Sequence, residues 1–267
     1  MTRPAAVVTG AAAGIGRAAA ELFAERGYGV VAVDLAEPPF AELARDPGIV
    51  PLTGDVAEES VNEAAVCLAL DRFGSLDAVV LNAGIGGTPP LEAPGAVERF
   101  DRMVAVNLRG PVLGIRAAAP VLRSRGGGAI VITTSVSGLA GDPGVWAYNA
   151  TKAALVNLVR GASIDYAADG VRINAVAPGL TDTPRTAVHH AEPGLVAELT
   201  RRIPMGRWAR PREQAEAIWF LASPAASYIT GVTLLVDGGL TASTGLLPPP
   251  ERPPPVTREQ TRGLATS

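Results

Sequence analysis

Strand-like apolar runs and helical patterns alternate along this chain from its first residues, and this alternation constrains the fold more than any other feature. The apolar runs are short and mostly continuous, which is typical of strands covered on both faces. They fall at residues 5–9, 29–33, 49–52, 78–81, 129–133, 172–176 and 233–236. Helical patterns lie between them, at 15–26, 58–73, 97–123 (expected to form two helices), 147–167 and 211–221. The alternation predicts an α/β fold with a doubly wound parallel sheet of about seven strands and helices on both faces.

The length of the chain fits one such domain. It has 267 residues, of which 48% are hydrophobic, and this is enough for one sizeable core. We expect the domain to span residues 1–244. Residues 245–267 contain two runs of three prolines, which exclude regular helix and central strand, so an extended or disordered tail is expected there. Residues 184–210 are a long connection, which is typical of a lid or binding loop.

Composition argues against several classes of function. A net charge of -3 disfavours nucleic-acid binding, whose footprint is usually a basic patch. The chain opens without a signal-peptide pattern and has no apolar run of membrane-spanning length, so we expect a cytoplasmic protein with no membrane partner. Histidine, cysteine and carboxylate side chains do not cluster at metal-ligand spacing, so no metal is expected. Cys67 lies in an apolar helical pattern and is expected in the core.

A glycine-rich turn follows the first expected strand and opens directly into a helix. Residues 9–16 read Thr-Gly-Ala-Ala-Ala-Gly-Ile-Gly, with glycines at Gly10, Gly14 and Gly16. Glycines allow a tight turn and let a pyrophosphate approach the backbone, while the helix N-terminus offers free N–H groups to the anion. A structural turn without a ligand is the alternative. The strand before and the helix after favour dinucleotide binding.

Asp34 ends the second expected strand and bears on the choice of dinucleotide. A carboxylate at this point can accept hydrogen bonds from the ribose hydroxyls and repels a 2′-phosphate, which favours NAD over NADP. Ala13 and Leu35 supply no cation for a phosphate. Arg17, in the first turn of the helix, is the counter-argument, because its side chain could reach such a phosphate. Asp34 could also be an ordinary strand-end cap.

Tyr148 and Lys152 stand four residues apart and therefore share one face of the expected helix. A free tyrosine is a weak base near neutrality, and a nearby ammonium stabilises its phenolate, so the pair is a plausible acid/base for a hydroxyl proton. Lys152 is the single lysine among 23 basic residues, which indicates a position that requires a compact ammonium. Ser135 follows the strand at 129–133 and could reach the same substrate oxygen. Alone, each of these residues has a common structural explanation.

Taken together, these motifs resemble the short-chain dehydrogenase/reductase family, in its compact single-domain form with a Rossmann fold. The resemblance covers residues 5–239. The matching positions are residues 9–16, Asp55 and Val56, Asn82 to Gly84, Asn107, Ser135, Tyr148, Lys152, Pro178 and Gly179, and residues 237–239. Their order and spacing agree, which makes the match specific. Leu81 and Ile132 stand where the family often has asparagine.

The resemblance implies a role for each matching residue. Tyr148 would be the general acid/base, Lys152 would bind the nicotinamide ribose and stabilise the phenolate, Ser135 would polarise the substrate oxygen, and Asn107 would hold a water in a proton relay. The implied cofactor-binding set is Gly10, Gly14, Ile15, Gly16, Asp34, Asp55, Val56, Asn82, Ala83, Gly84, Tyr148, Lys152, Pro178, Gly179, Thr181 and Thr183. Asn107 could instead be structural, and Asp55 could be a helix cap.

The expected substrate pocket is bounded by Ile85, Ser137, Trp146, Leu180 and the connection at 184–210. Trp146 and Leu180 suggest an apolar wall, which suits a cyclic or medium-chain alcohol or ketone.

The resemblance implies an NAD-dependent oxidoreductase that interconverts a secondary alcohol and a ketone, assembled as a homotetramer or homodimer. One alternative is an NADPH-dependent 3-oxoacyl-carrier-protein or polyketide-type ketoreductase, in which Arg123, Arg125, Arg201 and Arg202 would face an acidic carrier. An alternative of another class is a dinucleotide-binding sensor or scaffold without catalysis. The intact set of Ser135, Tyr148 and Lys152 speaks against the sensor.

Overall fold

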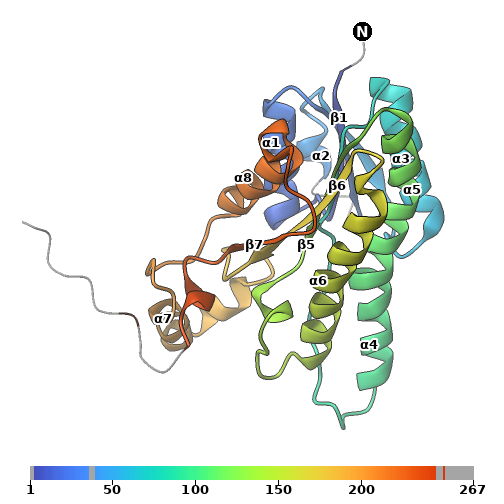
Figure 1. The fold of residues 1–267 in the computed structure, drawn as a ribbon. Helices are drawn as coiled ribbons and strands as arrows, with labels where there is room; N and C mark the ends of the chain where they lie inside the picture. Colours follow the sequence, from blue (N-terminus) through green and yellow to red (C-terminus); the bar gives the residue numbers. More distant parts are fainter. Residues whose placement is uncertain (1–2, 36–39, 245–248, 250–267) are drawn as a thin grey trace, which may run out of the picture.

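The molecule is built around one seven-stranded sheet in which all neighbouring strands run parallel. The structure is a computed structural model that describes residues 3–35, 40–244 and 249. The strand order is β3-β2-β1-β4-β5-β6-β7 (Figure 1). The strands are β1 Ala5–Thr9, β2 Gly29–Asp34, β3 Ile49–Thr53, β4 Ala78–Leu81, β5 Gly128–Thr133, β6 Val171–Pro178 and β7 Thr233–Val236. The predicted doubly wound parallel sheet is therefore confirmed, and every strand overlaps its predicted range.

Helices cover both faces of this sheet. The α-helices are α1 Gly14–Glu25, α2 Phe40–Leu43, α3 Glu59–Phe73, α4 Ala96–Val104, α5 Gly110–Ser124, α6 Trp146–Ala167, α7 Pro193–Arg201 and α8 Pro211–Ala222. Helices α1 and α8 pack on one face, and α3, α5 and α6 pack on the other (Figure 1). Alternate strand residues face the two layers, because successive side chains point to opposite faces of a strand. In β1, Ala6 and Val8 face α1 and α8, whereas Val7 faces α3.

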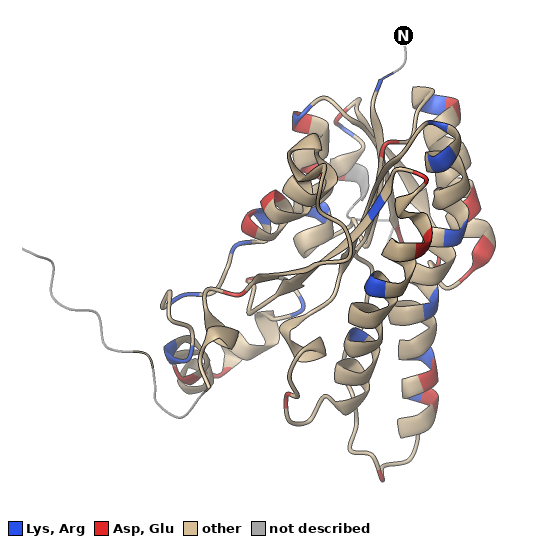
Figure 2. Ribbon diagram, viewed as in Figure 1, with Lys and Arg blue, Asp and Glu red and all other residues tan. Residues whose placement is uncertain are grey.

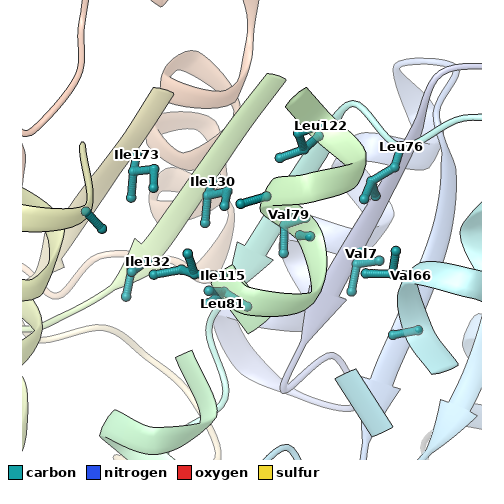
Figure 3. Packing of buried hydrophobic residues seen from close by; sticks show 14 of the residues in the cluster. Val7, Val66, Leu76, Val79, Leu81, Ile115, Leu122, Ile130, Ile132 and Ile173 are labelled. Atoms are coloured by element: carbon teal, nitrogen blue, oxygen red, sulfur yellow. The ribbon is translucent and has the colours of Figure 1, made fainter. Parts of the chain in front are cut away.

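The larger core lies between the sheet and helices α3, α5 and α6 (Figure 3). Val79, Ile130 and Ile173 contribute from three adjacent strands, and Leu122 of α5 packs over them. These side chains are almost fully buried. Aliphatic packing of this kind fixes the sheet, so the ends of its strands form a stable frame for a site.

The structure departs from the sequence predictions at several places. The helical pattern at 97–123 contains two helices, as expected, but α4 and α5 are continuous through a π-helical turn at Ala105–Arg109. The connection at 184–210 contains α7, which was not predicted. The expectation that Cys67 is a core residue is wrong, because its side chain is exposed. Helix α3 buries Ala65, Val66 and Ala69, and Cys67 lies on its other face.

The expectation of an extended or disordered tail at 245–267 lies outside the described residues, apart from Pro249. None of the helices in the described ranges is long and apolar enough to span a lipid bilayer.

Arg172 of β6 ties the C-terminal end of α8 to the sheet. Its guanidinium donates to the carbonyl oxygens of Leu221 (2.7 Å), Ala222 (3.2 Å), Ser223 (3.1 Å) and Ile229 (3.3 Å). The last carbonyls of a helix have no partner within the helix, so a cation at this point satisfies them and complements the helix dipole. Partial burial lowers the pKa of Arg172, but an arginine remains charged.

We expect Arg172→Met to lower the free energy of unfolding by about 2–4 kcal/mol, because it leaves several partly buried carbonyls without a donor. Urea unfolding measures the change. Arg116→Met is the matched control, since Arg116 makes an exposed ion pair with Glu59 and its removal should cost little. Equal stabilities for the two variants would contradict this role of Arg172.

Candidate functional site

A cleft of about 340 Å³ lies at the carboxyl ends of the strands, where ligands bind in open α/β sheets. Most of the predicted site residues line it. They are Gly10, Gly14, Ile15, Asp34, Asp55, Val56, Asn82, Ala83, Gly84, Ile85, Ser135, Tyr148, Lys152, Pro178, Gly179, Thr181 and Thr183. Five predicted residues do not line it, namely Gly16, Asn107, Ser137, Trp146 and Leu180.

The glycine-rich turn has no room for side chains. Gly10 has a φ of +68°, and a Cβ atom there would lie 2.8 Å from Cα of Ala83. A Cβ on Gly16 would lie 2.0 Å from the carbonyl oxygen of Gly10. Asn82 holds the turn from the end of β4, because its side-chain amide donates to the carbonyl of Thr9 over 3.1 Å. The turn is therefore fixed by close packing between the ends of β1 and β4.

Two further features of this cleft fit a dinucleotide. Helix α1 begins at Gly14 without a side-chain cap, so its first N–H groups are available to an anion. The hydroxyl of Thr133 is buried at the cleft wall and has no hydrogen-bond partner among the described residues. Polar groups left unpaired in a buried wall indicate a place for a ligand or water.

Asp34 lies at the β2 end of the cleft. Its carboxylate accepts hydrogen bonds from the backbone N–H groups of Ala12 (2.9 Å) and Leu35 (2.7 Å). Arg17 does not line the cleft. Its guanidinium forms ion pairs with Glu21 at 2.9 Å and Glu42 at 2.8 Å. Arg17, which the sequence suggested as a partner for a 2′-phosphate, is therefore already paired with two carboxylates.

Asp55, after β3, lines the same end of the cleft and has two partners of its own. It accepts from the backbone N–H of Ala57 over 2.9 Å and pairs with Arg102 at 2.7 Å. Burial alone would raise the pKa of Asp55, but these hydrogen bonds and the charge of Arg102 hold it below its ordinary value. The carboxylate is therefore ionised and fixed in position.

Lys152 lies one helical turn after Tyr148 on α6 and is almost completely buried. Its Nζ donates to the carbonyl of Thr133, at the end of β5, over 2.8 Å and lies 5.6 Å from the centre of the Tyr148 ring. Burial, and to a smaller extent the positive charge of Arg185, lowers the pKa of Lys152 from its ordinary 10.5 to about 7. The ammonium is thus held at the end of the cleft that carries Tyr148.

Ser135 and Ser137 form a short hydrogen-bonded chain. The Oγ atom of Ser135 lies 3.1 Å from that of Ser137, which donates in turn to the carboxylate of Asp142 over 2.5 Å. The backbone N–H of Ser137 also donates to Ser135 Oγ over 3.1 Å. Ser135 faces the cleft, and Ser137 lies behind it as its support. Ser137 was predicted to bound the substrate pocket. In the structure it contacts Ser135 and does not line the cleft.

Asn107 lies in the π-helical turn and is fully buried. Its amide oxygen accepts from the N–H of Ile85 over 2.7 Å, and its amide nitrogen donates to the carbonyl of Ile85 (3.0 Å) and to Thr151 Oγ1 (3.2 Å). The side chain therefore fixes the segment after β4 against α6, next to Lys152. Its expected role in a proton relay stays a prediction.

The expected substrate residues are only partly brought together. Ile85 lines the cleft, whereas Trp146 packs on Phe100 and donates to the carbonyl of Pro89 over 3.0 Å. Leu180 lies outside the cleft, with its carbonyl bonded to the N–H of Ala209. The apolar wall expected from Trp146 and Leu180 is thus absent from the cleft lining.

Arg185 lines the cleft and was missed from the sequence. Its guanidinium donates to the carbonyl of Gly84 and lies 5.9 Å from the centre of the Tyr148 ring. Its position in the sequence could have indicated this, because Arg185 follows Thr183 by two residues in the segment after the carboxyl end of β6. Within the described ranges, histidine, cysteine and carboxylate side chains form no group of three or more that could hold a metal ion.

Residues 10–241 match the family model described as Enoyl-(Acyl carrier protein) reductase. The chain is 45% identical over 241 residues to cis-4-hydroxycyclohexanecarboxylate dehydrogenase of Sinomonas cyclohexanicum, covering 89% of this chain and 96% of the relative. It is 38% identical to 2-(R)-hydroxypropyl-CoM dehydrogenase of Xanthobacter autotrophicus, with coverage of 89% and 98%. The chain belongs to the short-chain dehydrogenase/reductase family, and it is an oxidoreductase of that family.

The fold agrees with solved structures of this family. A 3-ketoacyl-(acyl-carrier-protein) reductase from Brucella melitensis, solved with NADH, has a TM-score of 0.83 and 35% sequence identity to this chain. The alignment covers 89% of this chain and 98% of the reductase chain. The family binds nicotinamide dinucleotides.

The lowered pKa of Lys152 predicts a pH dependence of stability in the cofactor-free protein. The folded state binds this proton more weakly than the unfolded state, so the buried ammonium lowers the free energy of unfolding. This destabilisation is complete below about pH 7 and disappears as the pH rises toward the unfolded pKa of 10.5. Wild type should therefore gain stability relative to Lys152→Met between these values, by at most about 1.4 kcal/mol per pH unit. Urea unfolding of both proteins at several pH values measures this, and parallel curves would refute it.

Proposed function

We propose that this chain interconverts a secondary alcohol and a ketone with NAD(H), using Tyr148 as the acid/base. The main observation behind this proposal is that one cleft has candidate catalytic side chains at one end and a carboxylate at the other. Ser135, Tyr148 and Lys152 line one end, and the carboxylate of Asp34 lines the other. A dinucleotide that lies between them would have its adenosine ribose at Asp34 and its nicotinamide beside Tyr148.

The proton is handled by the side chains at the reacting end. In the oxidative direction, the phenolate of Tyr148 takes the hydroxyl proton of the alcohol, and in the reductive direction the phenol returns it to the carbonyl oxygen. The hydroxyl of Ser135, which donates to Ser137 in the structure, turns its proton to the same substrate oxygen when substrate binds. Lys152, one helical turn away, stabilises the phenolate by its positive charge. When bound, the nicotinamide group supplies or accepts the hydride.

Supporting residues keep this arrangement rigid. Asp142 and Ser137 orient the hydroxyl of Ser135 from behind. Asn107 bonds to Ile85 and Thr151, and it thereby fixes both the cleft wall and the helix that carries Lys152. Such preorganisation matters because a small displacement of a reacting group lowers the rate strongly.

Two observations support NAD as the cofactor. The carboxylate of Asp34 disfavours a 2′-phosphate, and Arg17, which could have attracted one, is paired with Glu21 and Glu42 outside the cleft. The Brucella neighbour of this fold was solved with NADH. The substrate we propose is a small cyclic or medium-chain alcohol, in keeping with relatives named for ring and hydroxypropyl alcohols.

The Brucella neighbour also supports an alternative, a reductase of 3-oxoacyl groups on a carrier protein. The arginines expected to face an acidic carrier give this reading little support. Arg123 lies in the last turn of α5, shortly before β5, so it is at the amino ends of the strands, opposite the cleft, and it pairs with Asp169. Arg201 and Arg202 both pair with Glu198. Figure 2 shows basic and acidic positions scattered over the outer helices.

Tyr148→Phe tests the proposed chemistry. Turnover of a panel of secondary alcohols should fall at least about a hundredfold, because the acid/base is lost, while NADH binding followed by fluorescence stays close to wild type. Tyr166→Phe, on the same helix but away from the cleft, is the matched control. Full activity of Tyr148→Phe would exclude the mechanism, and a wild type that binds NADH without turning over any alcohol would favour the sensor.

Asp34→Asn tests the proposed cofactor choice. We expect wild type to bind NADH more tightly than NADPH, and we expect the variant to raise the ratio of NADPH to NADH affinity by about tenfold, or about 1.4 kcal/mol. The substitution removes the charge and keeps the size of the side chain. Parallel titrations with both cofactors measure the ratio. Tighter binding of NADPH by wild type would reverse the assignment and make the carrier-protein reductase the better proposal.

A further inference from the structure

Arg185 places a second positive charge at the reacting end of the cleft. It belongs to the segment after β6, reaches the carbonyl of Gly84 after β4, and lies 5.9 Å from the centre of the Tyr148 ring. The proposed mechanism does not use it. Lys152 already supplies the charge that stabilises the phenolate, so Arg185 requires a separate explanation.

Arg185 has no anionic partner within the part of the chain that the structure describes. The ion pairs found there involve other arginines or His190, and the one hydrogen bond of Arg185 is to a backbone carbonyl. Its side chain is exposed to the cleft, so it keeps its charge in solvent. Five N–H donors in a planar fork match a carboxylate better than they match a single carbonyl.

The acidic side chains of the cleft are too distant to pair with Arg185. Two carboxylates lie in the lining: Asp34 is the last residue of β2, and Asp55 follows β3. The guanidinium reaches the carbonyl of Gly84 after β4, and two strand spacings separate β4 from β2, which amounts to about 10 Å. Asp55 is also paired with Arg102. The cleft is therefore negative at the ribose end and positive at the reacting end.

We propose that Arg185 binds a carboxylate carried by the substrate, so that the substrate class is a hydroxy acid, or the corresponding oxo acid, with a small hydrocarbon frame. This inference rests on the proposed function, because it places the alcohol or ketone oxygen at Tyr148. The guanidinium is close enough to the Tyr148 ring for one small molecule to contact both. Such an ion pair also orients the reacting carbon, in addition to contributing affinity.

The electrostatics of the cleft support this inference. The charge of Arg185 contributes to the lowered pKa of Lys152, which means that the two cations repel each other without an anion between them. A carboxylate at Arg185 would offset that repulsion and favour the charged form of Lys152. An acid substrate would thus help to prepare the group that acts on it.

A second anion that Arg185 could meet is the pyrophosphate of the cofactor. The structure favours the substrate, because the segment's earlier residues contact the phosphate-binding turn. A Cβ on Gly14 would lie 3.2 Å from Cγ2 of Thr183 and 4.0 Å from Cδ of Pro184. Arg185 comes next in the chain and extends away from that turn to Tyr148 and Gly84.

Binding of an unreactive acid to the enzyme–NADH complex tests the inference without turnover. The probe is cyclohexanecarboxylate, and its uncharged counterpart is cyclohexanecarboxamide, with affinities measured by calorimetry or by quenching of NADH fluorescence. Wild type should bind the acid at least about tenfold more tightly than the amide, and Arg185→Gln should abolish that difference. Arg99→Gln is the matched control. Arg99 also donates to backbone carbonyls in the segment after β4, those of Gly86 and Gly87, but it does not line the cleft.

Every outcome of this experiment either supports or overturns the role of Arg185. Wild type that fails to prefer the acid, or Arg185→Gln that keeps the preference, overturns the inference. A loss of NADH affinity in Arg185→Gln, without a change in the acid-to-amide ratio, assigns Arg185 to the cofactor instead. Equal effects of Arg185→Gln and Arg99→Gln would show that the guanidinium only holds the Gly84 segment. Acid binding that depends on Arg185, combined with no turnover of any hydroxy acid, would retain the anion site and reject the proposed function.

Discussion

The parallel pairing of β1 with β2 on one side and β4 on the other is the constraint on which the site depends. Chain order reverses at this point, so the connections after β1 and β4 turn to opposite faces of the sheet and leave a crevice between them. Gly10 lies at the mouth of this crevice with no space for a Cβ atom. Asn82 links the two strand ends by a hydrogen bond to Thr9. Every group of the cleft takes its position from this pair of strand ends.

A second constraint is a buried cation close to Tyr148. Lys152 lies in a wall built by β5 and α6, and among the described residues its ammonium has one hydrogen-bond partner, the backbone carbonyl of Thr133. Placing a charge there costs stability in the cofactor-free protein, because burial disfavours the charged form. Natural proteins retain such a cost where the group is needed for function. The sheet and the hydrogen bond from Asn107 to Thr151, the residue before Lys152, keep the lysine in place despite this cost.

The sequence predicted the sheet well because parallel strands buried on both faces read as continuous apolar runs, such as the one at β5. It also predicted which residues would gather at the cleft, since strand ends of a parallel sheet meet at one edge. It failed where a side chain's direction depends on its neighbours. Trp146 suits a substrate wall by composition, but Phe100 and the carbonyl of Pro89 hold it elsewhere. Arg185 was missed because no periodic pattern marks a loop residue that reaches across a cleft.

The choice of lysine at 152 and arginine at 185 follows from their surroundings. A lysine can lose its proton, so a buried position with a pKa of about 7 can accommodate it, whereas a guanidinium would stay charged and require several acceptors. Arg172 illustrates that requirement, since it is partly buried only with four carbonyls around it. Arg185 is exposed in the cleft, where a permanent charge costs little and remains available to an incoming anion. In a chain that otherwise uses arginine for its basic residues, the one lysine is the buried cation, whereas Arg185 is exposed in the cleft.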